Sequence, residues 1–201
     1  GLGDVYKRQA AIDALTINTQ NTATATLSVG NIGAGTVDAA DNGTNFAGVT
    51  GATTIGNTNS GAITFSGTIY KTDGAFDITS KAGTDTTDKE IIFGGASPFI
   101  STSGDQVTLN GGEVEIQNGT LTINTNRNNG GDNGGAITIA KTVYGASDES
   151  LVLDAHSSGT GTISLGPIGA ATSQIAGITA TANGGITFCL LYTSDAADES
   201  D

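Results

Sequence analysis

A short phrase recurs along this chain, and it constrains the fold more than any other feature of the sequence. Its copies read GAITF at 61–65, GAITI at 135–139 and GGITF at 184–188. Each copy has the length of a strand, alternates apolar with small polar residues, and begins with glycine. Recurrence of this kind is typical of architectures that stack one small unit on the next. We therefore expect a repetitive, stacked β-structure.

Longer strings recur as well. Residues 25–36 align with 161–172, and residues 61–70 align with 135–144. These matches predict a little more than one long repeat, assembled from smaller strand units, with no linker to mark a domain boundary.

The two ends differ from the Thr-, Gly- and Ala-rich text between them. Residues 1–9 read GLGDVYKRQ and residues 189–201 read CLLYTSDAADESD, and both resemble translated sequencing-adapter sequence. We set them aside from fold reasoning as adapter-like segments, which leaves 10–188 as a β-repeat segment. On this interpretation the natural protein is expected to continue past both ends.

Composition favours a thin core over a thick one. Aromatic residues make up 5% of the chain, Trp and Met are absent, and there are 31 glycines. Only 13% of the residues are charged and β-branched residues are common, whereas disordered chains show the reverse balance. We therefore expect an ordered chain whose core is made of stacked Ile, Val and Leu.

Charge and hydropathy exclude two classes of partner. The net charge is −13, and binding to a phosphate backbone requires clustered Lys and Arg, so we expect no nucleic acid. No run of about 18 apolar residues exists, so we expect no membrane insertion of this segment.

Period-two alternation of apolar residues dominates the chain and predicts strands rather than helices. In the clearest stretch, 106–124, Asn-Gly dipeptides separate three apolar pairs, and Asn and Gly tolerate the backbone of a sharp bend. These pairs are Val107/Leu109, Val114/Ile116 and Leu121/Ile123. Further pairs are Leu15/Ile17, Leu27/Val29, Ile63/Phe65, Phe76/Ile78, Ile137/Ile139, Leu151/Leu153, Ile163/Leu165 and Ile186/Phe188.

Two all-β folds can use this pattern. An antiparallel β-sandwich or meander would use Asn-Gly as hairpin turns. A parallel β-helix (β-solenoid) would use Asn and Gly as corners, and the repeats and the small apolar residues favour it. Three faces of about five residues predict a coil of roughly twenty residues. Seven or eight such coils would make a rod of roughly 35 to 40 Å at about 4.8 Å per coil.

The repeat style resembles a known family. Strings such as TLSVGNIGAGT, GAITFSGTI and GTISLGPIGAATSQIAGITATANGGITF are similar to the β-strand-repeat passenger regions of filamentous-haemagglutinin-like and autotransporter-type bacterial adhesins. The resemblance covers roughly residues 14–188. It implies a right-handed parallel β-helix shaft on the bacterial cell surface, secreted to the extracellular side, with a role in adhesion.

The partners that this resemblance implies are a host-cell or matrix surface, glycans or other adhesin repeats, and neighbouring repeats of the same parent chain. It supplies no catalytic residues.

Enzyme chemistry finds little support in the residues. Glu113 and Glu115 share one strand face and could do acid–base work, but two adjacent outward acids are more often a solvated face. His156 is the only histidine, and no partner with a recognisable spacing accompanies it. Arg127 lies in an expected loop. We predict no enzyme and no catalytic, cofactor-binding or metal-ligating residue, with a carbohydrate-active β-helix enzyme as the less favoured alternative.

A ligand-binding β-solenoid for calcium, glycan or ice stays open as an alternative. Residues 130–135 are one imperfect copy of a Gly- and Asp-rich calcium repeat, and residues 85–88 lack the glycine and distal glutamate of an EF-hand. The Thr-Ala-Thr-Ala-Thr string at 22–26 could order water only if the same array recurred on successive coils.

Overall fold

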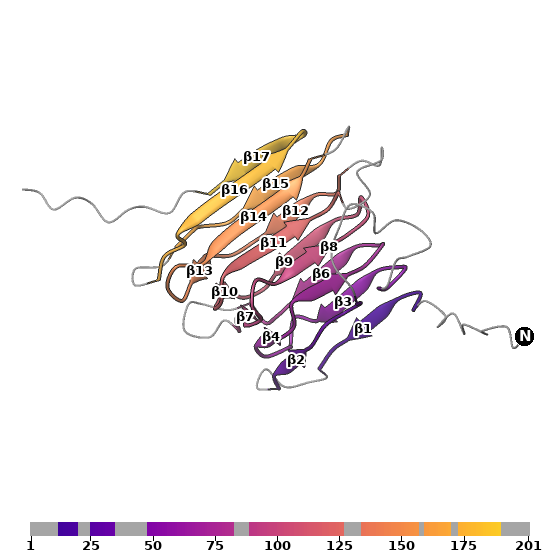
Figure 1. The fold of residues 1–201 in the computed structure, drawn as a ribbon. Helices are drawn as coiled ribbons and strands as arrows, with labels where there is room; N and C mark the ends of the chain where they lie inside the picture. Colours follow the sequence, from indigo (N-terminus) through magenta and orange to yellow (C-terminus); the bar gives the residue numbers. More distant parts are fainter. Residues whose placement is uncertain are drawn as a thin grey trace, which may run out of the picture.

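The computed structural model describes residues 12–19, 25–34, 48–82, 89–126, 134–156, 159–169 and 173–189. These segments form 17 strands and no helix (Figure 1). The strands belong to three sheets, and within each sheet neighbouring strands pair in parallel.

Sheet 1 has seven strands: β1 (Leu15–Ile17), β3 (Thr53–Gly56), β6 (Phe76–Thr79), β9 (Val107–Asn110), β12 (Ile137–Ile139), β15 (Thr162–Leu165) and β17 (Gly185–Phe188). Sheet 2 has five: β2 (Leu27–Val29), β4 (Ile63–Phe65), β7 (Ile91–Phe93), β10 (Val114–Ile116) and β13 (Val143–Gly145). Sheet 3 has five: β5 (Ile69–Lys71), β8 (Phe99–Ser101), β11 (Thr120–Asn124), β14 (Ser150–Ala155) and β16 (Gly177–Ala182).

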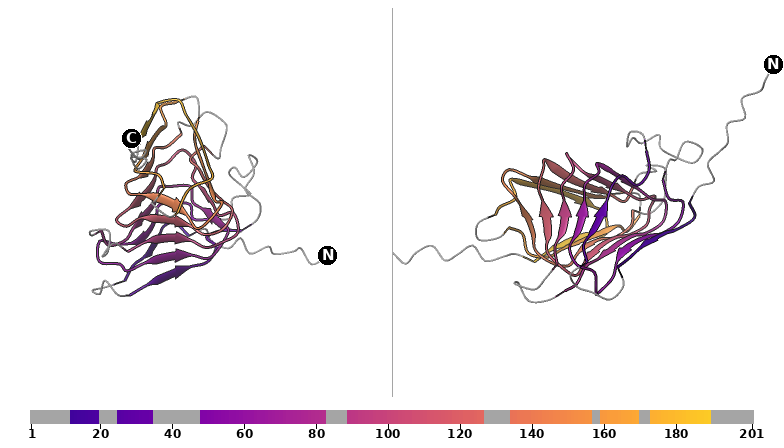
Figure 2. Two further views of the ribbon diagram at one scale, coloured as in Figure 1. Left: turned by 90° about the vertical axis from the view of Figure 1, so that its left-hand side faces the viewer. Right: turned by 90° about the horizontal axis from the view of Figure 1, so that it is seen from below.

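From β3 to β15 the chain visits sheet 1, sheet 2 and sheet 3 in turn and then returns to sheet 1, one step further along the stack. In the first coil an isolated bridge of Ile32 to Tyr70 takes the place of a strand in sheet 3, and in the last coil a bridge of Ile168 to Val143 takes the place of a strand in sheet 2. Strands β9, β10 and β11 form one such coil, and β12, β13 and β14 pair with them to form the next. In Figure 2 the coils follow one another along the stack in chain order, from the indigo end to the yellow end. The parallel β-helix is confirmed, and the antiparallel sandwich or meander is wrong. The hand of the coil stays a prediction.

The clearest stretch of the sequence is one whole coil. Its three apolar pairs lie in β9, β10 and β11, one on each sheet, with both side chains of every pair buried. The Asn-Gly dipeptides between them form the corners, where Gly111 has φ of 106° and Gly119 has φ of 69°. L-residues rarely adopt such values, which explains glycine at both positions.

The coils are longer and less regular than the sequence predicts. Hydrogen bonds between neighbouring coils join Ser97 to Thr120, 23 residues apart, and Asn124 to Asp154, 30 residues apart. Near the first coil the separation between Asn57 and Thr19 is 38 residues. The expectation of roughly twenty residues per coil is therefore wrong, because the connections between strands are longer than expected and vary more than the strands, which have three to six residues. With seven strands, sheet 1 spans roughly 29 Å at about 4.8 Å per step.

The core consists of inward rows that run along the stack, one residue from each strand. In sheet 1 the row that contains Ile55, Ile78 and Leu109 continues through Ile139 and Leu165. All five side chains are at most 2% exposed. Burial of apolar surface contributes about 25 cal/mol per Å², so every added coil extends the stabilising core.

An aromatic cluster interrupts the aliphatic rows, which the sequence reading does not anticipate. Phe65 stacks on Phe93 in the next coil with ring centroids 5.0 Å apart, and it meets Tyr70 edge-on at 5.1 Å. The Tyr70 hydroxyl donates to the carbonyl of Gly67 (2.9 Å), and burial raises the pKa of Tyr70 to about 12. The sequence analysis places Phe65 and Phe76 among its apolar pairs, so the ring contacts with Phe93 and Tyr70 are what go beyond the expected stack of Ile, Val and Leu.

The repeated phrase does not return to the same face. Its copy at 61–65 supplies β4 in sheet 2, whereas the copies at 135–139 and 184–188 supply β12 and β17 in sheet 1. The two copies of the longer match also lie on different sheets. Residues 25–36 contain β2 of sheet 2, and residues 161–172 contain β15 of sheet 1. The expected long repeat is therefore not a whole number of coils, and its copies are offset by one face.

A buried threonine row lines the corner between sheet 3 and sheet 1. Thr72, Thr102 and Thr125 are 0% exposed, and their hydroxyls donate to the carbonyls of Gly51, Asp105 and Gly135. Each hydroxyl thus pairs with a main-chain oxygen at a bend, and the carbonyl of Gly51 also accepts from the N–H of Gly74 (3.2 Å).

Candidate functional site

The outer face of sheet 1 carries a row of hydroxyl groups, and this is the most ordered surface feature of the described residues. The central residue of each strand points outward, because its neighbours on either side point into the core. Strand register aligns these central residues across the sheet. The row reads Thr16, Thr54, Asp77, Thr108, Thr138, Ser164 and Thr187.

The row is accessible to solvent along its whole length. Thr16, Ser164 and Thr187 are exposed, and the remaining members are partly exposed. Neighbouring hydroxyls are spaced by the strand separation of about 4.8 Å. Asp77 interrupts the row, and its Oδ1 accepts a hydrogen bond from Gln106 Nε2 (3.3 Å).

Sequence reasoning missed this row. It searched for Thr-x-Thr strings along the chain, whereas the structure builds the array across strands from one threonine per coil. The available signal in the sequence was the central threonine of the repeated phrase at 135–139 and 184–188. Only the strand register shows that these two threonines lie on one sheet.

The outer face of sheet 2 is acidic. Glu90 and Glu113 are neighbours on adjacent strands, since the N–H of Ile91 donates to the carbonyl of Glu113 (2.8 Å). Glu115 lies two residues further along, in register with Tyr144. Burial raises the pKa of Tyr144 well above its ordinary value, and the charges of Glu115, Glu90 and Glu113 raise it further.

The two acids singled out in the sequence do share this face. Glu113 and Glu115 are both partly exposed and flank the buried Val114. Within the described ranges no group of three His, Cys, Asp or Glu side chains could hold a metal ion.

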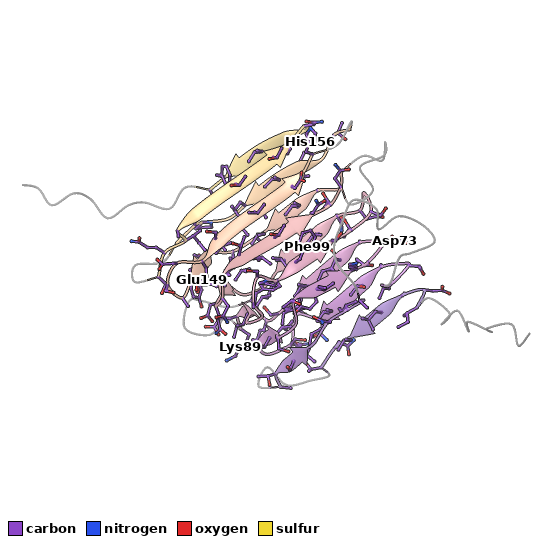
Figure 3. The ribbon with its side chains drawn as sticks, viewed as in Figure 1. Asp73, Lys89, Phe99, Glu149 and His156 are labelled. Carbon is purple, nitrogen blue, oxygen red and sulfur yellow. The ribbon has the colours of Figure 1, made fainter. Side chains whose placement is uncertain are left out.

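His156 lies at an edge of the stack. It follows β14 and is exposed, and its main-chain N–H donates to Asp154 Oδ1 (2.9 Å). Figure 3 shows His156 and Asp73 on the side of the stack opposite to Lys89 and Glu149.

Several sequence candidates lie outside the described residues. These are Arg127, residues 130–133 of the Gly- and Asp-rich segment, residues 85–88, and residues 22–24 of the threonine string.

Glu149 is a buried acid that the sequence did not single out. It is 4% exposed, and its carboxylate accepts hydrogen bonds from the main-chain N–H and the hydroxyl of Ser147. Its side chain occupies the space beside Gly145, where a Cβ would approach Glu149 Oε2 to 2.8 Å. The Glu149 side chain therefore fills the inward position that an apolar side chain takes in the preceding coils.

The described part of the chain holds no helix that could cross a bilayer. Comparison with family models, curated proteins and solved structures found no match for this chain. Function therefore has to be argued from the stack and its surfaces.

Proposed function

We propose that this chain is a shaft segment of a large bacterial surface adhesin. It would be secreted to the extracellular side, where it spans distance and presents binding regions without performing catalysis. The observation that carries this proposal is the stack itself: three parallel sheets share one continuous core, from the first described coil to the last.

Physical properties of such a stack suit a spacer. Each coil contacts only its neighbours, so the length of the rod can grow without a change in its cross-section. The connections between strands differ in length while the core rows continue, so the corners and the outer faces of the sheets can vary and give places for contacts to a host-cell or matrix surface or to glycans. Neighbouring repeats of a parent chain would continue the same rows.

The spacer role can be tested by display on bacteria. The chain is placed between a membrane anchor and a small binding domain, and energy transfer between dyes on the anchor and on the domain measures the distance between them. We expect one narrow distribution of distances, whereas a Gly/Ser linker of the same number of residues should give a broad one, because a flexible coil has no fixed length and only an r.m.s. end-to-end distance of roughly 5 to 6 Å times the square root of its residue number.

A matched control separates rigidity from composition. The variant Gly112→Ala, in which a corner is disrupted, should broaden the distribution of distances at equal surface expression. Equally broad distributions for the linker and the intact chain would contradict the spacer role.

The hydroxyl row favours a second candidate function, binding of ordered water at an ice surface. Hydroxyls at one fixed spacing on successive coils are the arrangement that this function requires, and sheet 1 carries six of them interrupted once, by Asp77.

Inhibition of ice recrystallisation tests this second candidate. The variant Thr138→Lys places a charged chain in the middle of the row and should weaken inhibition. Thr64→Lys is the matched control, because Thr64 holds the same place in the repeated phrase but lies on sheet 2. Equal activity of both variants, or no inhibition by the unchanged chain, would rule the row out as an ice-binding surface.

A further inference from the structure

Exposure of large apolar side chains concentrates at the two ends of the stack. Among the described residues these side chains are Ile12 (56% exposed), Ile186 (40%) and Phe188 (39%). Ile12 lies before β1, where it forms an isolated bridge with Val49, and the other two belong to β17, the last strand of sheet 1. In the coils between them, the corresponding inward side chains are covered on both sides and fully buried.

The partly buried core residues follow the same distribution. They lie in or next to the terminal coils: Leu15, Leu27, Ile168, Ile175, Ile178, Ala180 and Ala182. Each end of the stack therefore presents a section through the core, with apolar side chains that a further coil would cover.

Main-chain groups are left at these ends as well. Within the described residues β1 has one neighbour in sheet 1, which is β3, and β17 has one, which is β15. An edge strand offers main-chain N–H and C=O groups to another strand.

The two ends match each other in pattern. Strand β1 presents Leu15 and Ile17 inward with Thr16 outward. Strand β17 presents Ile186 and Phe188 inward with Thr187 outward. If β1 of one molecule followed β17 of another in the register of sheet 1, both apolar rows of sheet 1 and the hydroxyl row would continue.

Strand direction selects the type of contact. A β1 end placed on a β17 end keeps all strands parallel, as in the three sheets of this chain. Two β17 ends related by a two-fold axis would instead pair their strands antiparallel. Head-to-tail docking is therefore the geometry that continues the existing coil-to-coil interface.

We infer that the β17 end of the stack is a docking surface for the β1 end of a second copy of this chain. The contact joins different surfaces of the two copies, so it does not close and builds an open rod. In the proposed shaft, further repeats of the parent chain would cover these same surfaces, so the contact is inferred for the 201-residue chain as a separate molecule and does not depend on the adhesive role. Because every copy carries a net charge of −13, assembly should strengthen as salt screens the repulsion.

Sedimentation velocity of the full 201-residue chain tests the inference across a wide range of concentration, at low and high NaCl. We expect species that grow in length with concentration and more strongly at high salt. Phe188→Lys buries a charge in the contact and should weaken association at least about tenfold. Thr187→Lys, on the same strand but facing outward, should leave it unchanged.

A mixing experiment fixes the polarity. Leu15→Lys blocks the β1 end and leaves β17 intact, whereas Phe188→Lys does the reverse. Each variant alone should be monomeric, and an equimolar mixture should form dimers and nothing longer. Dimer formation also shows that both variants are folded, because each contributes its intact end.

Three results would overturn the inference: an unchanged chain that stays monomeric at high salt, a Thr187→Lys variant that dissociates as readily as Phe188→Lys, or a mixture that stays monomeric while circular dichroism shows both variants folded. Dimerisation of a single variant alone would instead indicate contact between like ends.

Discussion

Thr53 is a polar residue in an apolar row. It lies in β3 between Leu15 and Phe76 and is 0% exposed, and its hydroxyl has no hydrogen-bond partner among the residues that the structure describes. Burial of an unpaired hydroxyl costs free energy that an apolar group of the same shape would not.

We therefore expect Thr53→Val to raise the free energy of unfolding by about 1 kcal/mol. Chemical denaturation followed by circular dichroism measures the change. A loss of stability would show that the hydroxyl has a role in the coil.

Thr125→Val is the matched control. The Thr125 hydroxyl is equally buried but donates to the carbonyl of Gly135 (2.8 Å), so its removal leaves a buried acceptor unpaired. The same measurement should show a loss of about 1 to 3 kcal/mol. If the free energy of unfolding rises for Thr53→Val and falls for Thr125→Val, hydrogen bonding of the hydroxyl and not its burial decides the sign of the change.

At the scale of the element, the corners constrain the chain more tightly than the strands. Gly112 is buried at the corner between sheet 1 and sheet 2, and its N–H donates to the Ser80 hydroxyl (2.9 Å). A Cβ at this position would overlap the main-chain carbonyl of Lys89. The neighbouring coil leaves no room for it.

Gly112→Ala should therefore lower the free energy of unfolding by about 3 kcal/mol or more, because main-chain atoms must move. Gly30→Ala is the control, since a Cβ there would meet nothing within 4 Å. It should be neutral or stabilise by roughly 0.4 to 1 kcal/mol through the unfolded chain. Thermal denaturation measures both variants. An equal loss of stability in Gly112→Ala and Gly30→Ala would contradict this account.

The strands were predictable from the sequence because alternation is a local property. Each apolar pair named in the sequence lies in an observed strand, and the three pairs of 106–124 occupy three successive faces. Six strands contain none of the named pairs: β3, β5, β7, β8, β13 and β16. In β8 the outward residue is the apolar Phe99, and in β16 the inward positions include the small residue Ala180, so neither strand presents two large apolar residues on one face.

The candidate surface was not predictable for a different reason. The hydroxyl row depends on which strands share a sheet, and the corners that decide this differ in length from coil to coil. Thr64 and Thr138 occupy identical phrases yet lie on different sheets. No period along the chain encodes that difference.

At the scale of the whole molecule, the chain is acidic and carries like charges close together. The net charge is −13, and Glu90 and Glu113 are neighbours on the outer face of sheet 2. Like charges opposite each other on adjacent strands destabilise a sheet.

We therefore expect the melting temperature to rise with NaCl until the charges are screened, which for exposed groups is largely complete when the Debye length falls to a few Å. Differential scanning calorimetry measures the rise. The double variant Glu90→Gln with Glu113→Gln should show a higher melting temperature at low salt and a smaller response. A melting temperature that falls as NaCl is added would contradict the role of self-repulsion.

The one-face offset of the repeats has a consequence for how such a chain lengthens. A duplicated piece that contains one strand and one corner turns everything after it by a third of a revolution. The interior accepts this change, because all three faces present the same apolar pattern to the axis. The exterior does not, because any ordered motif on one side would be distributed over the others. Lengthening by a third of a turn therefore leaves inward residues inward but moves outward residues to a different sheet. An aligned surface row persists only where later insertions return its residues to their original sheet.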